Sequence, residues 1–264
     1  MERLIMLGTG NALVTRCYNT CFAIQDDDEY FLVDAGGGNG IIRQLQDADI
    51  SMVQIHHIFL THEHTDHLLG MIWMIRMIAT KMRREQYEGN LRIYCHSALV
   101  ETVRTIANLT LPKKFTRLLD HRIQFVPLHD GDTKHILDYD VTFFDILSTK
   151  AKQYGFTMRL KSGQKLTCAG DEPLNENCFG YAEAVIGSCM KPFVCIRSGT
   201  STIHMRSTTV PSVRPVNWRL ISMYQILFCT IPRMTTSNAE KPSIQQKADC
   251  IIKEISMCQT TWNV

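Results

Sequence analysis

The sequence of 264 residues lacks several features that mark membrane and secreted proteins. No apolar run approaches the roughly 20 residues that a membrane-spanning helix needs. The N-terminal segment MERLIMLGTG lacks the basic start, apolar stretch and cleavage site of a signal peptide. None of the ten cysteines forms a Cys-x-x-Cys pair, which argues against a zinc ribbon. We therefore expect a cytoplasmic protein with reduced thiols and no membrane partner.

The charge has no strong overall bias but changes along the chain. The formal net charge is +2, too small to indicate nucleic-acid binding by the chain as a whole. Residues 1–185 contain 19 Lys+Arg and 23 Asp+Glu, whereas residues 186–264 contain nine basic and three acidic residues. The second segment also holds five of the eight prolines and only two of the 15 glycines. This change predicts a boundary near residue 185, between a globular domain and an atypical basic tail.

Strand and helix patterns alternate within residues 1–185, which predicts the α/β class. Short apolar runs that end at glycine or turn residues indicate strands. The expected strands lie within residues 3–10, 19–25, 29–40, 55–62, 91–96, 122–128, 135–147, 154–160 and 164–170. The expected helices are residues 40–50, 67–86 and 97–109.

The segment FLTHEHTDHLLG, at residues 59–70, places four metal-binding side chains within six residues. They follow an apolar strand pattern and precede a helix pattern, so they can converge on one centre. Imidazole and carboxylate together suit Zn²⁺, with Mn²⁺ or Fe²⁺ also open. A bound cation with an open coordination position lowers the pKa of water toward about 7. A polar loop with solvated histidines is the alternative, but it leaves this density of ligands unexplained.

With this segment, the sequence resembles the metallo-β-lactamase-fold hydrolase superfamily, and within it the ribonuclease Z-like branch. The motif THEHTDH, at residues 61–67, carries most of the resemblance, together with LGTG at 7–10, YNT at 18–20 and VDAGGG at 33–38. The resemblance covers residue 1 to about residue 185. It implies an αββα four-layer sandwich, with metals held between the two layers at the sheet edges.

The resemblance also implies a role for individual residues. The implied metal ligands are His62, His64, Asp66, His67 and Asp171. His62 and His64 would bind a first metal, and Asp66 and His67 a second, with Asp171 bridging the two. Asp66 would also act in catalysis, by orienting the attacking water and moving its proton. Asp34 would support the histidine loop from behind the ligands. For Asp34 and Asp171, an ordinary turn aspartate is the alternative.

Two histidines of the family pattern are missing. One is expected ahead of the Gly155-Phe156 pair, at about position 147, where this chain has Leu147. His129 and His135 could substitute for it, although both are typical of surface loops. The other missing histidine is the final ligand near the C-terminus, where the tail shows no family pattern.

A shift of reading frame is one hypothesis for the origin of the tail. If each codon is rebuilt from the third base of one codon and the first two of the next, the residue after Met190 becomes Glu and the residue after Met223 becomes Val. A consistent rebuilt sequence contains HHST and YHTED, which resemble the family's phosphate-handling segment and its final histidine. We infer that one base was lost near the codons for Val185 and Ile186. The second half of the sandwich is then expected to be incomplete or disordered. A genuine basic tail and an appended domain are the alternatives.

The predicted function is metal-dependent hydrolysis at a two-metal site, by a phosphodiesterase or an RNA 3′-end endonuclease that processes tRNA. The resemblance suggests RNA as the substrate. Residues 1–185 show no long Gly/Pro-rich arm for gripping tRNA, however, so a small phosphodiester or another ester fits as well. The resemblance also makes a homodimer possible. One alternative is a remnant that is impaired or inactive because the late histidines are missing. A further alternative, β-lactam hydrolysis, would need an export signal for its usual compartment.

Overall fold

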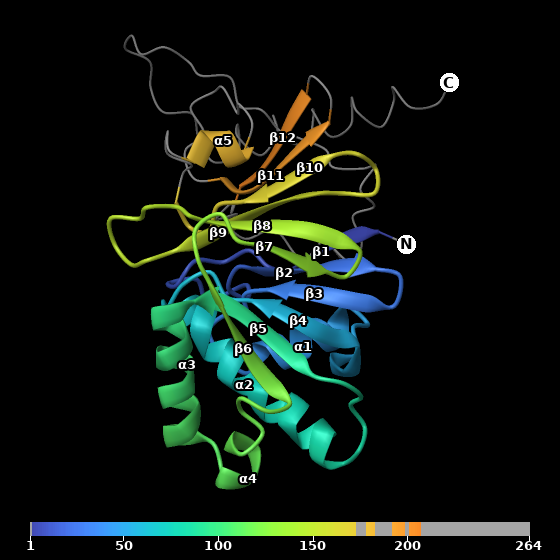
Figure 1. Ribbon diagram of the computed structural model, residues 1–264, viewed down its shortest axis with the longest axis vertical. Helices are drawn as coiled ribbons and strands as arrows, with labels where there is room; N and C mark the ends of the chain where they lie inside the picture. Colours follow the sequence, from blue (N-terminus) through green and yellow to red (C-terminus); the bar gives the residue numbers. More distant parts are fainter. Residues whose placement is uncertain (1, 173–177, 183–191, 199–200, 207–264) are drawn as a thin grey trace. The chain divides into compact units, whose positions relative to one another are not determined.

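The computed structural model describes residues 2–172, 178–182, 192–198 and 201–206 (Figure 1). The chain divides into two units, Met1–Tyr224 and Gln225–Val264, and every described residue belongs to the first. Among the described residues, no helix combines the length and the apolar character needed to cross a membrane.

The first sheet has six strands in sequence order. Strands β1 (Arg3–Gly8), β2 (Cys21–Asp26) and β3 (Glu29–Val33) form an antiparallel meander. Strands β4 (Ile55–Phe59), β5 (Leu91–His96) and β6 (Ile123–Leu128) continue it in parallel. The carboxyl ends of β3, β4 and β5 therefore lie along one edge, where ligands of parallel sheets usually bind.

Four α-helices and a short 3₁₀ helix connect these strands. They are α1 (Gly40–Asp47), the 3₁₀ helix Met52–Gln54, α2 (Thr65–Arg83), α3 (Ser97–Thr110) and α4 (Lys113–Thr116). Figure 1 shows α1, α2 and α3 on the side of the first sheet that faces away from the second sheet. Leu45 of α1, Met74 of α2 and Val103 of α3 are buried in one core cluster with the strands. Their burial supplies the main hydrophobic stabilisation of this layer pair.

The second sheet is antiparallel throughout, with six described strands in the order β12-β11-β10-β9-β8-β7. They are β7 (Thr133–Ile136), β8 (Tyr139–Asp145), β9 (Tyr154–Arg159), β10 (Lys165–Cys168), β11 (Pro192–Ser198) and β12 (Ser201–Arg206). The short helix α5 (Phe179–Ala182) packs against this sheet, with the Tyr181 and Phe144 rings stacked 4.7 Å apart.

Aromatic side chains join the two sheets face to face. Phe59 of β4 packs on Phe143 of β8 and Phe156 of β9, with ring centroids 4.9 and 5.7 Å apart. Phe31 of β3 also meets Phe156 edge-on at 5.7 Å. All four rings are fully buried, so they form part of a hydrophobic core between the sheets.

Two segments need comment against the sequence expectations. Residues 135–147, expected as one strand, contain a tight turn between β7 and β8, with Leu137 at φ 53°. In the basic tail, β11 and β12 add to the second sheet, but most of residues 186–264 lies outside the described residues. The expectation of an incomplete or disordered second half therefore stays a prediction there.

Candidate metal centre

The THEHTDH segment forms the turn between β4 and α2, as the sequence predicted. Strand β4 ends at Phe59, and α2 begins at Thr65 with His64 in an extended conformation as its N-cap. Gly70 allows α2 to dock closely, because a Cβ there would collide with the carbonyl oxygen of Ala35. The Gly70 amide also donates to the carbonyl oxygen of Gly36 at 2.8 Å. This docking holds the first turn of α2 against the glycine loop that follows β3.

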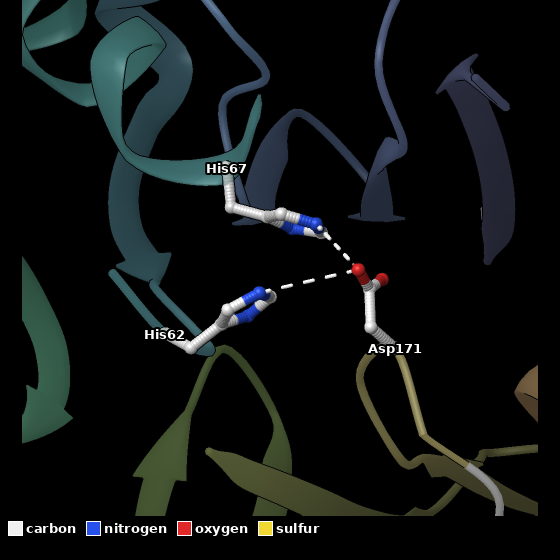
Figure 2. Close-up of side chains that lie close together, drawn as sticks. All are labelled: His62, His67 and Asp171. Atoms are coloured by element: carbon white, nitrogen blue, oxygen red, sulfur yellow. Dashed lines mark hydrogen bonds and ion pairs between the residues drawn. The ribbon is translucent and has the colours of Figure 1, made fainter. Parts of the chain in front are cut away.

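His62, His67 and Asp171 converge from three elements (Figure 2). One potential ligand atom of each lies within 4.8 Å of the others. The Asp171 Oδ2 atom is 3.2 Å from His67 Nε2 and 4.0 Å from His62 Nε2. Two donors bound to one zinc ion at about 2.0–2.2 Å lie about 3–4 Å apart, so these residues fit a divalent cation. Asp171 follows β10, so the second sheet completes the site.

His64 and Asp66 lie beside this trio. His64 Nδ1 is 2.9 Å from His62 Nε2, and Asp66 Oδ2 is 3.6 Å from His67 Nε2. The structure therefore groups His62 with His64 and Asp66 with His67, while Asp171 contacts both pairs. The His62 and His67 rings also lie close together, with centroids 4.2 Å apart, so these contacts do not by themselves divide the residues between two metals. The assignment of each residue to a metal stays a prediction.

Asp34 lies directly behind His67, fully buried at the end of β3. Its Oδ2 atom is 2.7 Å from His67 Nδ1, and its Oδ1 atom accepts a hydrogen bond from the Thr61 amide at 2.9 Å. Asp34 has φ 56°, a strained value that these contacts hold in place. Because Nδ1 is occupied, the Nε2 atom of His67 faces the proposed metal position.

The charges of the site favour a cation. Burial favours the neutral form of His67, but Asp34 and Asp171 outweigh it and raise the pKa of the ring to about 10. Burial, reinforced by His67, lowers the pKa of His62 to about 4. Burial would raise the pKa of Asp171, but the hydrogen bond from His67 overcomes it and lowers that pKa. The carboxylates of Asp34 and Asp171 thus both contact the His67 ring, and either a proton or a metal ion can neutralise their negative charge.

Position 147 lies next to the Asp171 loop. The Ser148 hydroxyl donates to Glu172 Oε1 at 2.9 Å, and Ile146 approaches Gly170. Leu147 itself is 53% exposed and has φ 52°. His129 and His135 are instead paired locally, with Asp132 at 3.7 Å and Asp140 at 3.1 Å. The structure does not bring either of these histidines to the metal centre.

The sequence interpretation missed three residues that support the site. The Thr61 hydroxyl contacts both Asp34 and His62, and the Gln153 side chain accepts a hydrogen bond from the Asp171 amide at 3.3 Å. His96, at the end of β5, faces Glu63 of the metal-binding turn. Thr61 and His96 both follow apolar strand patterns, a signal that could have identified them. No local pattern marks Gln153.

Comparison with solved structures identifies the class of fold to which this chain belongs. The structure resembles the short form of human tRNase Z, with a TM-score of 0.53 and 19% identity over 68% of this chain and 72% of that one. It also resembles YhfI of Bacillus subtilis, a metallo-β-lactamase-fold protein, with a TM-score of 0.55 and 14% identity over 69% and 68%. The chain has the metallo-β-lactamase fold, as the sequence predicted.

Sequence comparison then gives the family. A family model described as Anti-Pycsar protein Apyc1 matches residues 2–190, and the chain belongs to this family. The chain is also 34% identical over 108 residues to a ribonuclease Z of Methanococcus aeolicus, covering 40% of this chain and 32% of that protein. A ribonuclease Z of Pyrococcus abyssi is 34% identical over 109 residues, covering 41% and 34%. The chain thus spans about a third of the length of these two relatives.

Proposed function

We propose that this protein is a metal-dependent phosphodiesterase with a two-metal site. The convergence of His62, His67 and Asp171, with His64 and Asp66 beside them, carries this proposal. The names of the relatives support it, since ribonuclease Z and tRNase Z are names for enzymes that cleave phosphodiester bonds in RNA. Both RNA 3′ ends and small phosphodiesters are candidate substrates.

Each residue of the site contributes a defined action. His62 and His64 would hold the first cation, Asp66 and His67 the second, and Asp171 would touch both. Two divalent cations held there, Zn²⁺ by preference, would supply neutralisation of the charge on the scissile phosphate and would favour ionisation of water. Asp66, which is largely buried, would orient that water and accept its proton at Oδ2. Asp34 keeps the His67 ring aligned throughout.

Purified full chain with zinc should hydrolyse a chromogenic phosphodiester and a short RNA. The variants His62→Ala and Asp66→Asn should lose at least about a hundredfold in rate, because each removes a ligand or the proton acceptor. His135→Gln is the control, since this exposed histidine of β7 pairs with Asp140 of β8 and with none of the proposed metal ligands. Equal rates in Asp66→Asn and His135→Gln would refute the assignment.

A second candidate is a metal-binding remnant with impaired activity. The observation in its favour is Leu147, at about the position where the family resemblance predicts a histidine. A lost base near codons 185 and 186 would account for the tail, and the end of the family match at residue 190, close to that point, supports this proposal. Sequencing the gene tests this explanation directly: an unshifted frame that encodes the same tail in related genes would exclude it.

Two further proposals concern the cellular location and the oligomeric state of the protein. We propose a cytoplasmic location, for which fractionation of the source cells is the test. We also propose a homodimer, which light scattering of the purified chain would detect as twice the mass of 30.2 kDa.

A further inference from the structure

His96 is a buried histidine next to the metal centre that the proposed chemistry does not use. It is the last residue of β5 and the N-cap of α3, and only 3% of its surface is exposed. Its Nδ1 atom accepts a hydrogen bond from the Leu99 amide at 3.3 Å. Its Nε2 atom makes no hydrogen bond of 3.5 Å or less among the described residues, although the Lys152 backbone carbonyl lies near the ring. A buried polar atom in this state is costly and calls for an explanation.

The hydrogen bond to Leu99 fixes the tautomer of the ring. Because Nδ1 accepts a proton from the Leu99 amide, the neutral ring must carry its own proton on Nε2. Burial lowers the pKa of His96, and Glu63 opposes this shift only in part, so the ring is neutral near pH 7. His96 therefore presents one N–H donor from a buried position, and that donor needs an acceptor.

Two acceptors face this donor: the backbone carbonyl of Lys152, whose proximity raises the pKa of the ring, and the carboxylate of Glu63. Of the two, Glu63 is the charged one and the one that belongs to the metal-binding turn. Its Oε2 atom lies 3.7 Å from His96 Nε2, slightly beyond hydrogen-bond distance. The Glu63 side chain is 41% exposed, so a small rotation can close this gap. The location at the N-terminus of the 14-residue helix α3 also favours a carboxylate, because the helix dipole is positive there.

Glu63 lies in the chain between two of the proposed metal ligands. It lies between His62 and His64, whose facing nitrogen atoms are 2.9 Å apart. These two histidines are the proposed ligands of the first metal, which lacks the further histidine expected near position 147. With so few ligands, the affinity for that metal depends strongly on how the two rings are held.

We propose that His96 is a positioning residue for the metal centre, whose Nε2–H group holds the Glu63 carboxylate and thereby fixes the backbone between His62 and His64. This inference rests on the proposed function only in that His62 and His64 bind a metal. It gives His96 two separable tasks, because Nδ1 caps α3 while Nε2 anchors the metal-binding turn.

Three variants separate the two tasks. His96→Asn keeps a good N-cap acceptor but removes the donor that reaches Glu63. His96→Gln keeps a donor at similar reach but gives up the favoured cap. Glu63→Ala removes the acceptor and leaves the helix cap untouched. A role of His96 limited to capping would affect stability in His96→Gln and nothing else.

The measurement is the zinc affinity of the metal-stripped full chain, together with its urea midpoint. We expect His96→Asn and Glu63→Ala each to lower the affinity about tenfold without lowering the urea midpoint, and the double variant to be no weaker than either. His96→Gln should lower the urea midpoint and keep the affinity within about threefold of the original. Nitrogen-15 NMR of the apo chain should show the proton of His96 on Nε2.

The same measurements separate a failure of the proposed His96 role from a failure of the proposed function. Wild-type zinc affinity in His96→Asn, additive losses in the double variant, or a proton on Nδ1 would overturn the role of His96 alone. If the unsubstituted chain binds no zinc, the metal centre fails and this inference fails with it. Zinc binding with the expected losses, but without hydrolysis, would refute the proposed activity and leave the role of His96 standing.

Discussion

At the scale of single residues, Leu147 lies at about the position where the family resemblance predicts a histidine ligand. Its φ of 52° is strained for leucine, whereas His and Asn occupy this region several times more often than other residues do. Its neighbours on both sides contact the loop of Asp171. We expect Leu147→His to raise zinc affinity about tenfold, because it adds a ligand to the first metal site.

Leu147→Asn is the matched control for this substitution. Asparagine relieves the same backbone strain by about 1 kcal/mol but offers no imidazole. Both variants should therefore raise the urea midpoint, and only Leu147→His should tighten zinc binding. An equal gain in zinc affinity for the two would show that backbone strain, and not a missing ligand, limits the site.

A second prediction at this scale concerns His57 in β4. Burial, reinforced by Arg92 and His56, lowers the pKa of His57 to about 4. In the unfolded chain the same group titrates near its usual value of about 6.5, so the unfolded state binds more protons between these two values. The stability that depends on neutral His57 is therefore present above pH 6.5 and is lost as the pH falls toward 4.

The loss is roughly 1–3 kcal/mol after allowance for partial exposure. His57→Phe removes the titration along with the hydrogen bond to Tyr94. The variant should lose some stability at pH 8, yet its free energy of unfolding should fall less steeply between pH 6.5 and 4.5. Urea unfolding at a series of pH values measures this slope, and an unchanged slope would contradict the assignment.

At the scale of elements, the docking of α2 onto the glycine loop sets the position of the site. A glycine-to-alanine change inside a helix usually stabilises by about 0.5–1 kcal/mol. Gly70→Ala should instead destabilise by about 2–3 kcal/mol, because the new methyl group collides with the Ala35 carbonyl. It should also weaken zinc binding, since Asp66 and His67 lie one turn earlier in the same helix.

Gly38→Ala is the control for Gly70→Ala, because a Cβ at position 38 meets no atom within 4 Å. This variant should unfold within about 0.5 kcal/mol of the original chain, as surface substitutions usually do. Similar losses in both variants would mean that the glycine loop is simply intolerant of substitution, and that helix docking has no special role.

The same elements show what sequence patterns can and cannot predict. The metal-binding turn and α2 could be predicted because apolar periodicity and four clustered ligands are both local signals. The turn at Leu137 could not, because it contains no glycine or proline. A distant contact supports it instead, with Lys161 bridging Asp26 and Asp138 at 2.7 and 2.9 Å. The contact of His67 with Asp171, 104 residues apart, was likewise beyond local patterns and came only from family resemblance.

At the scale of the whole molecule, the predicted frame shift affects how completely the second sheet is covered by helices. The first sheet is covered by helices α1, α2 and α3, whereas α5 is the one helix described against the second sheet. A chain with the frame restored after residue 185 would supply an amphipathic helix pattern and a late histidine. We expect it to bury more apolar surface and to bind two zinc ions with higher affinity than the chain as written.

Urea unfolding and zinc titration of the two chains provide the comparison. Because the steepness of unfolding scales with the surface exposed, the restored chain should unfold with a larger urea dependence as well as a higher midpoint. Its phosphodiesterase rate should rise at least about a hundredfold, since a completed ligand set restores the means to ionise water. The His62→Ala variant of the restored chain should lose that gain while keeping the steeper unfolding. If restoration changed neither the urea dependence nor the zinc stoichiometry, the tail as written would have to be the native one, and the second sheet would be completed by some other means.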